Sequence, residues 1–181
     1  MIYEPAEDSF LMSKILEKNL PKLLKKSPNL KFLEIGSGSG INLETAKNSG
    51  IKKENIFSCD IDKRSISHCK KLEFNCINSD LFENIPKIKF DLIIFNPPYL
   101  PEDSREPKPS KKATTGGKRG NEIILRFLNQ TKDYLTKNGK IFLITSSLAE
   151  NVDFKKLGYK SKEIGCEKLF FEKLSIWEIT S

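Results

Sequence analysis

The residues best suited to chemistry are Asn96, Pro97, Pro98 and Tyr99, which directly follow the apolar run 90–95. Two consecutive prolines fix their own φ angles and disfavour helical geometry at the residue before them, so the chain must leave the strand extended. The Asn96 side-chain oxygen and a neighbouring main-chain carbonyl can then accept hydrogen bonds from one –NH₂ group, and the Tyr99 ring offers a flat face for stacking. The motif therefore predicts a site for a planar amide or an exocyclic amine, whereas Pro-Pro alone would indicate only a turn.

Three alternating glycines, Gly36, Gly38 and Gly40, follow the short apolar run 32–35 and precede a helix-like segment. Such glycines let the backbone approach a ligand closely. The spacing lacks the third glycine of G-x-G-x-x-G, which disfavours a pyrophosphate cradle. Glu34, just ahead of the glycines, would repel a diphosphate and suits a cationic or amine-bearing ligand.

Acidic residues also follow the next two predicted strands. Asp60 and Asp62 end the second strand about 20 residues beyond the last glycine, an offset at which a carboxylate binds ribose hydroxyls. Asp80 could accept from an adenine amino group, and the Leu81 N–H could donate to a ring nitrogen. One such Asp is more often a turn former, but acids after three consecutive strands would meet at one edge of a parallel sheet. The pattern predicts a nucleoside-like ligand without a phosphate chain.

With these motifs the chain resembles the class I S-adenosylmethionine-dependent methyltransferases, since residues 34–40 read E-I-G-S-G-S-G and residues 96–99 read N-P-P-Y. Residues 3–11, Y-E-P-A-E-D-S-F-L, are similar to the start of the archaeal and eukaryotic HemK-like release-factor glutamine methyltransferases, and residues 115–120 resemble that family's later glycine-rich stretch. Ser9 stands where the family usually has Thr. The resemblance implies that the following residues contact S-adenosylmethionine: Ser9, Glu34, Gly36, Gly38, Gly40, Asp60, Asp80, Leu81 and Asn96.

The resemblance also implies a reaction and partners. The catalytic motif 96–99 would hold the glutamine of a Gly-Gly-Gln motif in a peptide chain release factor for methylation of its side-chain amide, and a small zinc-binding activator protein would pair along the sheet edge. The alternative is a DNA or RNA methyltransferase acting on the exocyclic amine of adenine, because N-P-P-Y serves any planar –NH₂ group. A net charge of +7 and a pI near 9.1 keep a nucleic-acid partner open. A non-catalytic cofactor-binding subunit would predict broken motifs, and both motifs are intact.

The elements that must position these residues alternate along the chain. We expect a helix over 7–20, within an N-terminal cofactor cover at 1–22, and a helix near 149–156. Alternating patterns predict strands at 31–35, 56–60, 74–77, 91–95 and 140–145, helices near 41–49, 63–72 and 121–136, and two final strands at 159–164 and 169–179 that close at a Gly165 turn. This predicts an α/β fold: one Rossmann-like methyltransferase domain over 1–181, with a mostly parallel seven-stranded sheet, an antiparallel last strand and helices on both faces.

Length and composition agree with one compact domain, because 181 residues with 38% hydrophobic residues can bury a sizeable core. We expect a cytoplasmic protein, since no apolar run approaches a membrane span and the first residues lack the pattern of a signal peptide. The four cysteines lack metal-ligand spacing, so we expect no metal and free thiols. The segment 100–119 is rich in Lys and Pro and is expected to be a mobile basic loop, either a substrate-facing lid or a solvated loop.

Overall fold

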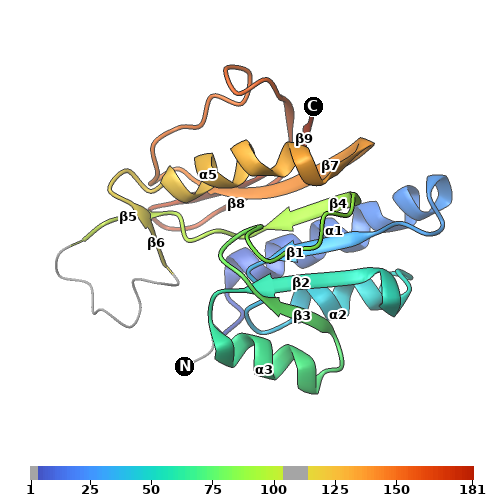
Figure 1. Cartoon of the computed structure of the whole chain (residues 1–181). Helices are drawn as coiled ribbons and strands as arrows, with labels where there is room; N and C mark the ends of the chain where they lie inside the picture. Colours follow the sequence, from blue (N-terminus) through green and yellow to red (C-terminus); the bar gives the residue numbers. More distant parts are fainter. Residues whose placement is uncertain (1–3, 104–113) are drawn as a thin grey trace.

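The computed structural model describes residues 4–103 and 114–181. Seven strands form one sheet in the order β3-β2-β1-β4-β7-β9-β8 (Figure 1). Their bounds are β1 (Phe32–Ile35), β2 (Ile56–Asp60), β3 (Asn75–Asn78), β4 (Phe90–Phe95), β7 (Leu135–Ser146), β8 (Lys160–Lys168) and β9 (Lys173–Thr180). The first five of these pair in parallel, while β9 runs antiparallel to both β7 and β8. The predicted α/β fold, with a mostly parallel sheet and an antiparallel last strand, is confirmed.

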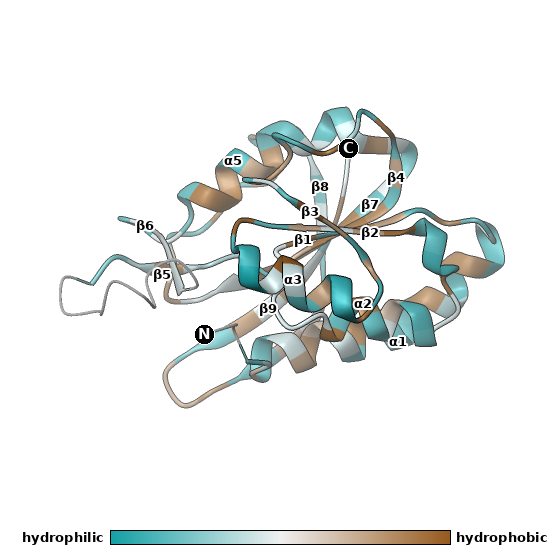
Figure 2. Cartoon of the chain, turned by 60° about the horizontal axis from the view of Figure 1, so that its bottom comes forward, coloured by the Kyte–Doolittle hydropathy of each residue, from teal (hydrophilic) through white to brown (hydrophobic). Residues whose placement is uncertain are grey.

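Helices cover both faces of the sheet, as expected. The helices are α1 (Glu7–Lys26), α2 (Ile41–Asn48), α3 (Lys63–Lys71) and α5 (Glu122–Thr131), with short 3-10 turns at η1 (Lys53–Asn55) and η2 (Lys132–Tyr134). Apolar residues of α1, α2 and α3 form one core cluster with one face of the sheet, and those of α5 form a second cluster with the other face (Figure 1). Brown predominates in the strands at the middle of the sheet in Figure 2, the edge strand β8 is teal, and the helices carry mixed brown and teal, which is the pattern of amphipathic helices packed on a sheet with a buried centre.

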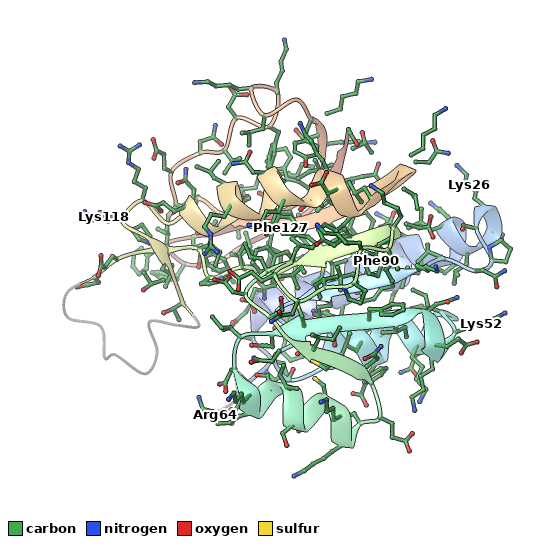
Figure 3. All side chains as sticks on the ribbon, viewed as in Figure 1. Lys26, Lys52, Arg64, Phe90, Lys118 and Phe127 are labelled. Carbon is green, nitrogen blue, oxygen red and sulfur yellow. The ribbon has the colours of Figure 1, made fainter. Side chains whose placement is uncertain are left out.

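Large apolar side chains fill the interior and basic side chains lie at the periphery. Phe90 and Phe127 are fully buried between α5 and the sheet (Figure 3). Lys26, Lys52 and Lys118 point away from the body of the molecule in the same view. The positive charge therefore rests on solvated side chains around a dry core.

Helix α1 is longer than expected, because it continues through Pro21 to Lys26 instead of ending near residue 20. Proline removes one backbone hydrogen bond inside a helix. Leu20 is fully buried and Leu23 and Leu24 pack against the same core cluster, so apolar burial offsets the missing bond. Its N-cap is Ala6, which makes no side-chain capping bond.

Two expectations near the C-terminus are wrong. The last two strands do not close at Gly165, which lies inside β8 at a register shift opposite β9. A Cβ there would come within 2.5 Å of Ile15 on α1, so the glycine serves helix packing. The helix expected near 149–156 is absent: residues 154–158 form hydrogen-bonded turns that end at Gly158 with φ 79°. A left-handed glycine stops a helix after one turn.

The ends of the predicted basic loop are held in place. β5 (Leu100–Pro101) pairs with β6 (Thr115–Gly117), and the Glu102 N–H donates to the Gly117 carbonyl at 2.9 Å. Residues 104–113, which carry most of the segment's basic side chains, lie outside the described residues, so the expected mobility of 100–119 stays a prediction.

All four cysteines are free, as expected, with only Cys166 exposed. Over the described ranges, no group of three or more His, Cys, Asp or Glu side chains is arranged to hold a metal ion. None of the helices described is both long and apolar enough to cross a bilayer.

Candidate active site

The predicted site residues gather at one edge of the sheet. β1 lies between β2 and β4, and the strand order changes direction between β1 and β4. The parallel strands β1, β2 and β4 lie side by side (Figure 1) and end at the same edge, so the glycine loop after β1, Asp60 at the end of β2 and Asn96 just after β4 meet there. Ligands of open α/β sheets bind at such a switch point.

The glycine loop is pinned to β2 on one side and open on the other. Gly36, Gly38 and Gly40 all have left-handed φ angles, between 47° and 82°. The N–H groups of Gly36 and Ser37 donate to the Cys59 carbonyl, and the Gly38 N–H donates to Asp60 Oδ2 at 2.9 Å. A Cβ built on Gly38 meets nothing within 4 Å, so the loop borders open space beside the Asp60 carboxylate.

Glu34 is a buried carboxylate with one free oxygen. Only 3% of the residue is exposed, and its Oε1 accepts from Asn42 Nδ2 at 2.9 Å. Its Oε2 is buried and has no hydrogen-bond partner among the described residues. Burial raises the pKa of Glu34 well above its usual value; the Asn42 amide opposes this shift, while Cys76 and Asp60 add to it. A cation placed at Oε2 would satisfy the orphan oxygen and favour ionisation.

Asp60 and Asp80 are both engaged but keep capacity as acceptors. Asp60 accepts from the backbone of Gly38 and of Asp62, at 2.9 and 2.8 Å, and burial is the main cause that raises its pKa. Asp80 pairs with Arg126 of α5 at 3.0 Å. Sequence reasoning did not single out Arg126, which comes from a helix more than 40 residues away in the chain. A carboxylate offers about four lone-pair sites, so Asp60 and Asp80 each keep acceptor sites that a ribose hydroxyl or an adenine amino group could use.

Leu81 has φ 48°, which is unusual for a residue with a side chain. The side chain is buried, and the Leu81 carbonyl accepts from Ser79 Oγ at 2.9 Å and from Cys59 Sγ at 3.4 Å. No hydrogen bond from its N–H is found within the part of the chain that the structure describes. Backbone strain of this kind collects at ligand sites. Here the strained residue follows Asp80 directly, and its N–H is left for a ligand to accept.

The N-P-P-Y motif also has an orphan acceptor. Asn96 Oδ1 is buried and has no partner among the residues described. The motif is braced by the later glycine-rich stretch: a Cβ on Gly116 would come within 2.5 Å of the Pro98 carbonyl oxygen, and a Cβ on Gly120 would collide with the Tyr99 carbonyl. Only glycines allow the two segments this close, so residues 115–120 fix the backbone that carries Asn96.

Tyr99 is tied to the start of α1. Its hydroxyl donates to Asp8 Oδ2 at 3.3 Å, and Asp8 Oδ1 accepts from the backbone and side chain of Ser9 at 2.6 and 3.2 Å. Asp8 and Ser9 are both buried. Sequence reasoning assigned Ser9 to the cofactor and missed Asp8 as the link, although the Y-E-P-A-E-D signature contains it. Contact between Ser9 and the cofactor stays a prediction, as does stacking on the Tyr99 ring.

The residues present fit S-adenosylmethionine. A free buried carboxylate oxygen on Glu34 suits an ammonium group, the open glycine loop suits close backbone approach, and Asp60 and the Leu81 N–H suit a nucleoside.

Comparisons with known proteins agree with this chemistry. The family model described as Eco57I restriction-modification methylase matches residues 9–157. A Methanocaldococcus jannaschii protein named for N5-glutamine methylation of proteins is 38% identical, over 97% of this chain and 89% of its own. The eRF1 methyltransferase catalytic subunit mtq2 of Schizosaccharomyces pombe is 32% identical, over 79% of this chain and 71% of its own. Among solved structures, a ribosomal protein L11 methylase of Lactobacillus delbrueckii superposes with a TM-score of 0.63 at 15% identity, over 98% of this chain and 80% of its own, which shows the same fold.

The family model covers the larger part of the chain, and the near full-length relative carries the glutamine activity in its name. The orphan Asn96 oxygen lies just after β4, at the same edge of the sheet as the glycine loop and Asp60, and a side-chain amide could donate to it. The chain belongs to the HemK-like family of S-adenosylmethionine-dependent protein N5-glutamine methyltransferases.

Proposed function

We propose that the substrate is the glutamine of a Gly-Gly-Gln motif in a peptide chain release factor. The observation that carries the proposal is the buried Oδ1 of Asn96, which has no partner among the described residues, lies at the edge of the sheet where β1, β2 and β4 end, and can accept one N–H of a side-chain amide. The name of the Schizosaccharomyces pombe relative, an eRF1 methyltransferase, supports a release factor as the protein that presents this amide. A substrate that works on the ribosome would place the enzyme in the cytoplasm.

The backbone of the motif provides the second acceptor. The carbonyls of Pro98 and Tyr99 face the glycine-rich stretch, as the blocked Cβ positions at Gly116 and Gly120 show. No described residue donates to the Pro97 carbonyl, so we assign the second amide N–H to that oxygen. When both N–H bonds of one –NH₂ group are accepted, by Asn96 Oδ1 and by the Pro97 carbonyl oxygen, the position and orientation of the amide nitrogen are fixed.

The chain's own residues then act by position. S-adenosylmethionine, when bound, supplies an activated sulfonium methyl group. Asn96 and Pro97 orient the amide nitrogen in line with the S–CH₃ bond, and orientation of this kind can supply about 7–11 kcal/mol of the barrier. The same two acceptors stabilise the positive charge that builds on nitrogen as the N–CH₃ bond forms and the S–CH₃ bond breaks. Asn96 is not a base, so the spare proton leaves to water after transfer.

A nucleic-acid methyltransferase is the second candidate, because the matching family model is named for restriction-modification methylases and the chain carries a net charge of +7. The near full-length relative is instead named for protein glutamine methylation, which favours the protein substrate.

The test uses S-adenosylmethionine labelled in the methyl group. Purified enzyme is incubated in parallel with a release factor, with the same factor carrying Gln→Ala in its Gly-Gly-Gln loop, and with DNA and RNA. We expect label on the intact factor alone. Label on the Gln→Ala factor at the same level, or on nucleic acid only, would refute the proposal.

We also propose a small zinc-binding activator protein as a partner along the β3 edge. β3 is the last strand at one end of the sheet, and in the described part of the chain no strand pairs with its outer side. That side can therefore act as a template for a strand from another chain. The name of the Schizosaccharomyces pombe relative, a catalytic subunit, supports a second subunit. The chain expressed with such a protein should show a higher melting temperature and faster methylation than the chain alone, and a zinc chelator should remove the gain. Full activity and unchanged stability of the chain alone would contradict this proposal without touching the substrate assignment.

A further inference from the structure

A chain of buried hydrogen bonds, called the relay below, joins α1, α2 and β1 through Ser13, Asn42 and Glu34. Ser13 on α1 donates through its hydroxyl to Asn42 Oδ1 on α2 at 3.0 Å, and Asn42 Nδ2 donates to Glu34 Oε1 on β1 at 2.9 Å. All three are buried, with exposed fractions of 9%, 4% and 3%. The hydroxyl proton of Thr45 is engaged by the Ile41 carbonyl at 2.8 Å, and the Thr45 oxygen lies 3.3 Å from Ser13 Oγ.

The relay has a direction. A side-chain amide has one accepting end and one donating end. In the structure the Asn42 oxygen accepts from the Ser13 hydroxyl, and the Asn42 –NH₂ group faces Glu34. One Glu34 oxygen is thereby held, and the other, Oε2, is left buried and free.

We propose that Ser13 and Asn42 are positioning residues that hold Glu34 so that its free oxygen receives the ammonium group of the cofactor's amino-acid portion, and that they couple cofactor binding to the seating of α1. The inference rests on the assignment of Glu34 to the cofactor, and it adds two residues that neither the sequence motifs nor the family resemblance single out. Ser13 places this control on the helix whose first turn also holds Tyr99 through Asp8.

The electrostatics of the relay agree with this role. The groups that act on the Glu34 carboxyl are Asn42 from α2, Cys76 from β3 and Asp60 from β2, and no Lys or Arg of the described residues is among them. Asn42 is the one group that lowers the pKa of Glu34, while burial and the other two raise it. Glu34 therefore ionises more readily once a cation arrives, and Asn42 sets how readily it does so without one.

The test compares two ligands by isothermal titration calorimetry. S-adenosylhomocysteine carries the amino-acid portion with its ammonium group, and 5′-methylthioadenosine has the same nucleoside and thioether but lacks that whole portion, carboxylate included. Asn42→Leu keeps the volume of the side chain and removes its donor. Since hydrogen bonds to charged groups contribute about 1.5–3 kcal/mol, we expect S-adenosylhomocysteine to bind about 10-fold or more weakly, with methylthioadenosine changed by less than about 2-fold.

Ser13→Ala is the second variant, in case Asn42→Leu fails to fold. It leaves the Asn42 amide free to turn and should weaken S-adenosylhomocysteine about 3-fold or more, with the same selectivity. Asn19→Leu is the matched control, because Asn19 lies on the same helix and its amide donates to the Ile15 carbonyl outside the relay. It should change neither ligand.

A pH series adds a readout that a loss of packing would not produce. S-adenosylhomocysteine binding should release a proton at pH values between the pKa of Glu34 in the complex and its raised pKa in the free protein, measured in buffers of different ionisation enthalpy. In Asn42→Leu this release should persist to higher pH, because the group that lowers the pKa of Glu34 is gone.

Equal weakening of both ligands, or no change for either, would overturn the role of the relay. If the wild-type protein bound both ligands equally tightly, the assignment of Glu34 to the ammonium group would fail. In either case the substrate assay with the release factor would still decide the proposed function on its own.

Discussion

Asn96→Ala should separate stability from catalysis, because Asn96 carries a buried oxygen that no residue in the described part of the chain satisfies. An unsatisfied buried acceptor costs about 1–3 kcal/mol. Removing it should therefore leave the melting temperature unchanged or higher, although alanine also leaves a small cavity. Asn96→Leu fills that cavity. For a protein of this size, a change of about 1 kcal/mol in the free energy of unfolding shifts the melting temperature by about 2–4 °C.

The catalytic rate, in contrast to the melting temperature, should fall in both Asn96 variants. Loss of a group that stabilises charge only in the transition state costs about 10²–10³-fold in kcat, or about 3–4 kcal/mol. Misalignment of the amide nitrogen adds to that loss. Both variants should bind S-adenosylhomocysteine within about 3-fold of wild type, because the proposed contacts to the amino-acid and nucleoside portions lie on Glu34, Asp60 and Leu81.

The assay combines differential scanning fluorimetry, calorimetric titration with S-adenosylhomocysteine, and single-turnover transfer of labelled methyl groups to the release factor. A melting temperature that drops by more than about 5 °C in Asn96→Leu would show that the Asn96 oxygen is satisfied in the free protein. Collapse of cofactor binding would instead show that Asn96 mainly holds the cofactor. Retained turnover would refute the catalytic assignment.

Glu34, Gly116 and the cysteines carry three more predictions. Glu34→Gln should raise the melting temperature of the cofactor-free protein at pH 8 more than at pH 5: burial raises the pKa of Glu34 in the fold, so the stability it contributes below its unfolded pKa is lost as pH rises through the folded pKa. Equal shifts at both pH values would contradict this. Gly116→Ala should lower kcat by about tenfold or more with cofactor affinity retained, since its Cβ would meet the Pro98 carbonyl at 2.5 Å; unchanged kinetics would show that the motif tolerates movement. A thiol reagent should modify Cys166 in the native protein and buried Cys59, whose pKa burial raises, only on unfolding; mass spectrometry of partly labelled protein would reveal the reverse order if the burial is wrong.

Patterns within short stretches determined the fold class and predicted which residues meet at one edge of the sheet. Short apolar runs placed β1 to β4 within one residue of their observed bounds, because strands buried on both faces read as nearly continuous apolar segments, whereas β7 begins five residues before its expected start at residue 140. The left-handed turns at Gly36, Gly38 and Gly40 and the extended exit at Pro97 follow from the φ angles that glycine and proline allow. The shared edge of Glu34, Asp60 and Asn96 follows from the parallel order of their strands.

Only the tertiary structure decided which partners hold those residues. The bond from Tyr99 to Asp8 spans 91 positions, and the Ser13–Asn42 bond spans 29. No local pattern encodes such pairs, since they depend on how helices dock on the finished sheet. Gly165 shows the same limit: its sequence predicts a turn, but its place in β8 is set by Ile15 on a helix packed against it. A short stretch of sequence fixes backbone geometry and burial through sterics and solvent, whereas hydrogen-bond partners and close approaches are fixed by the packing of distant segments.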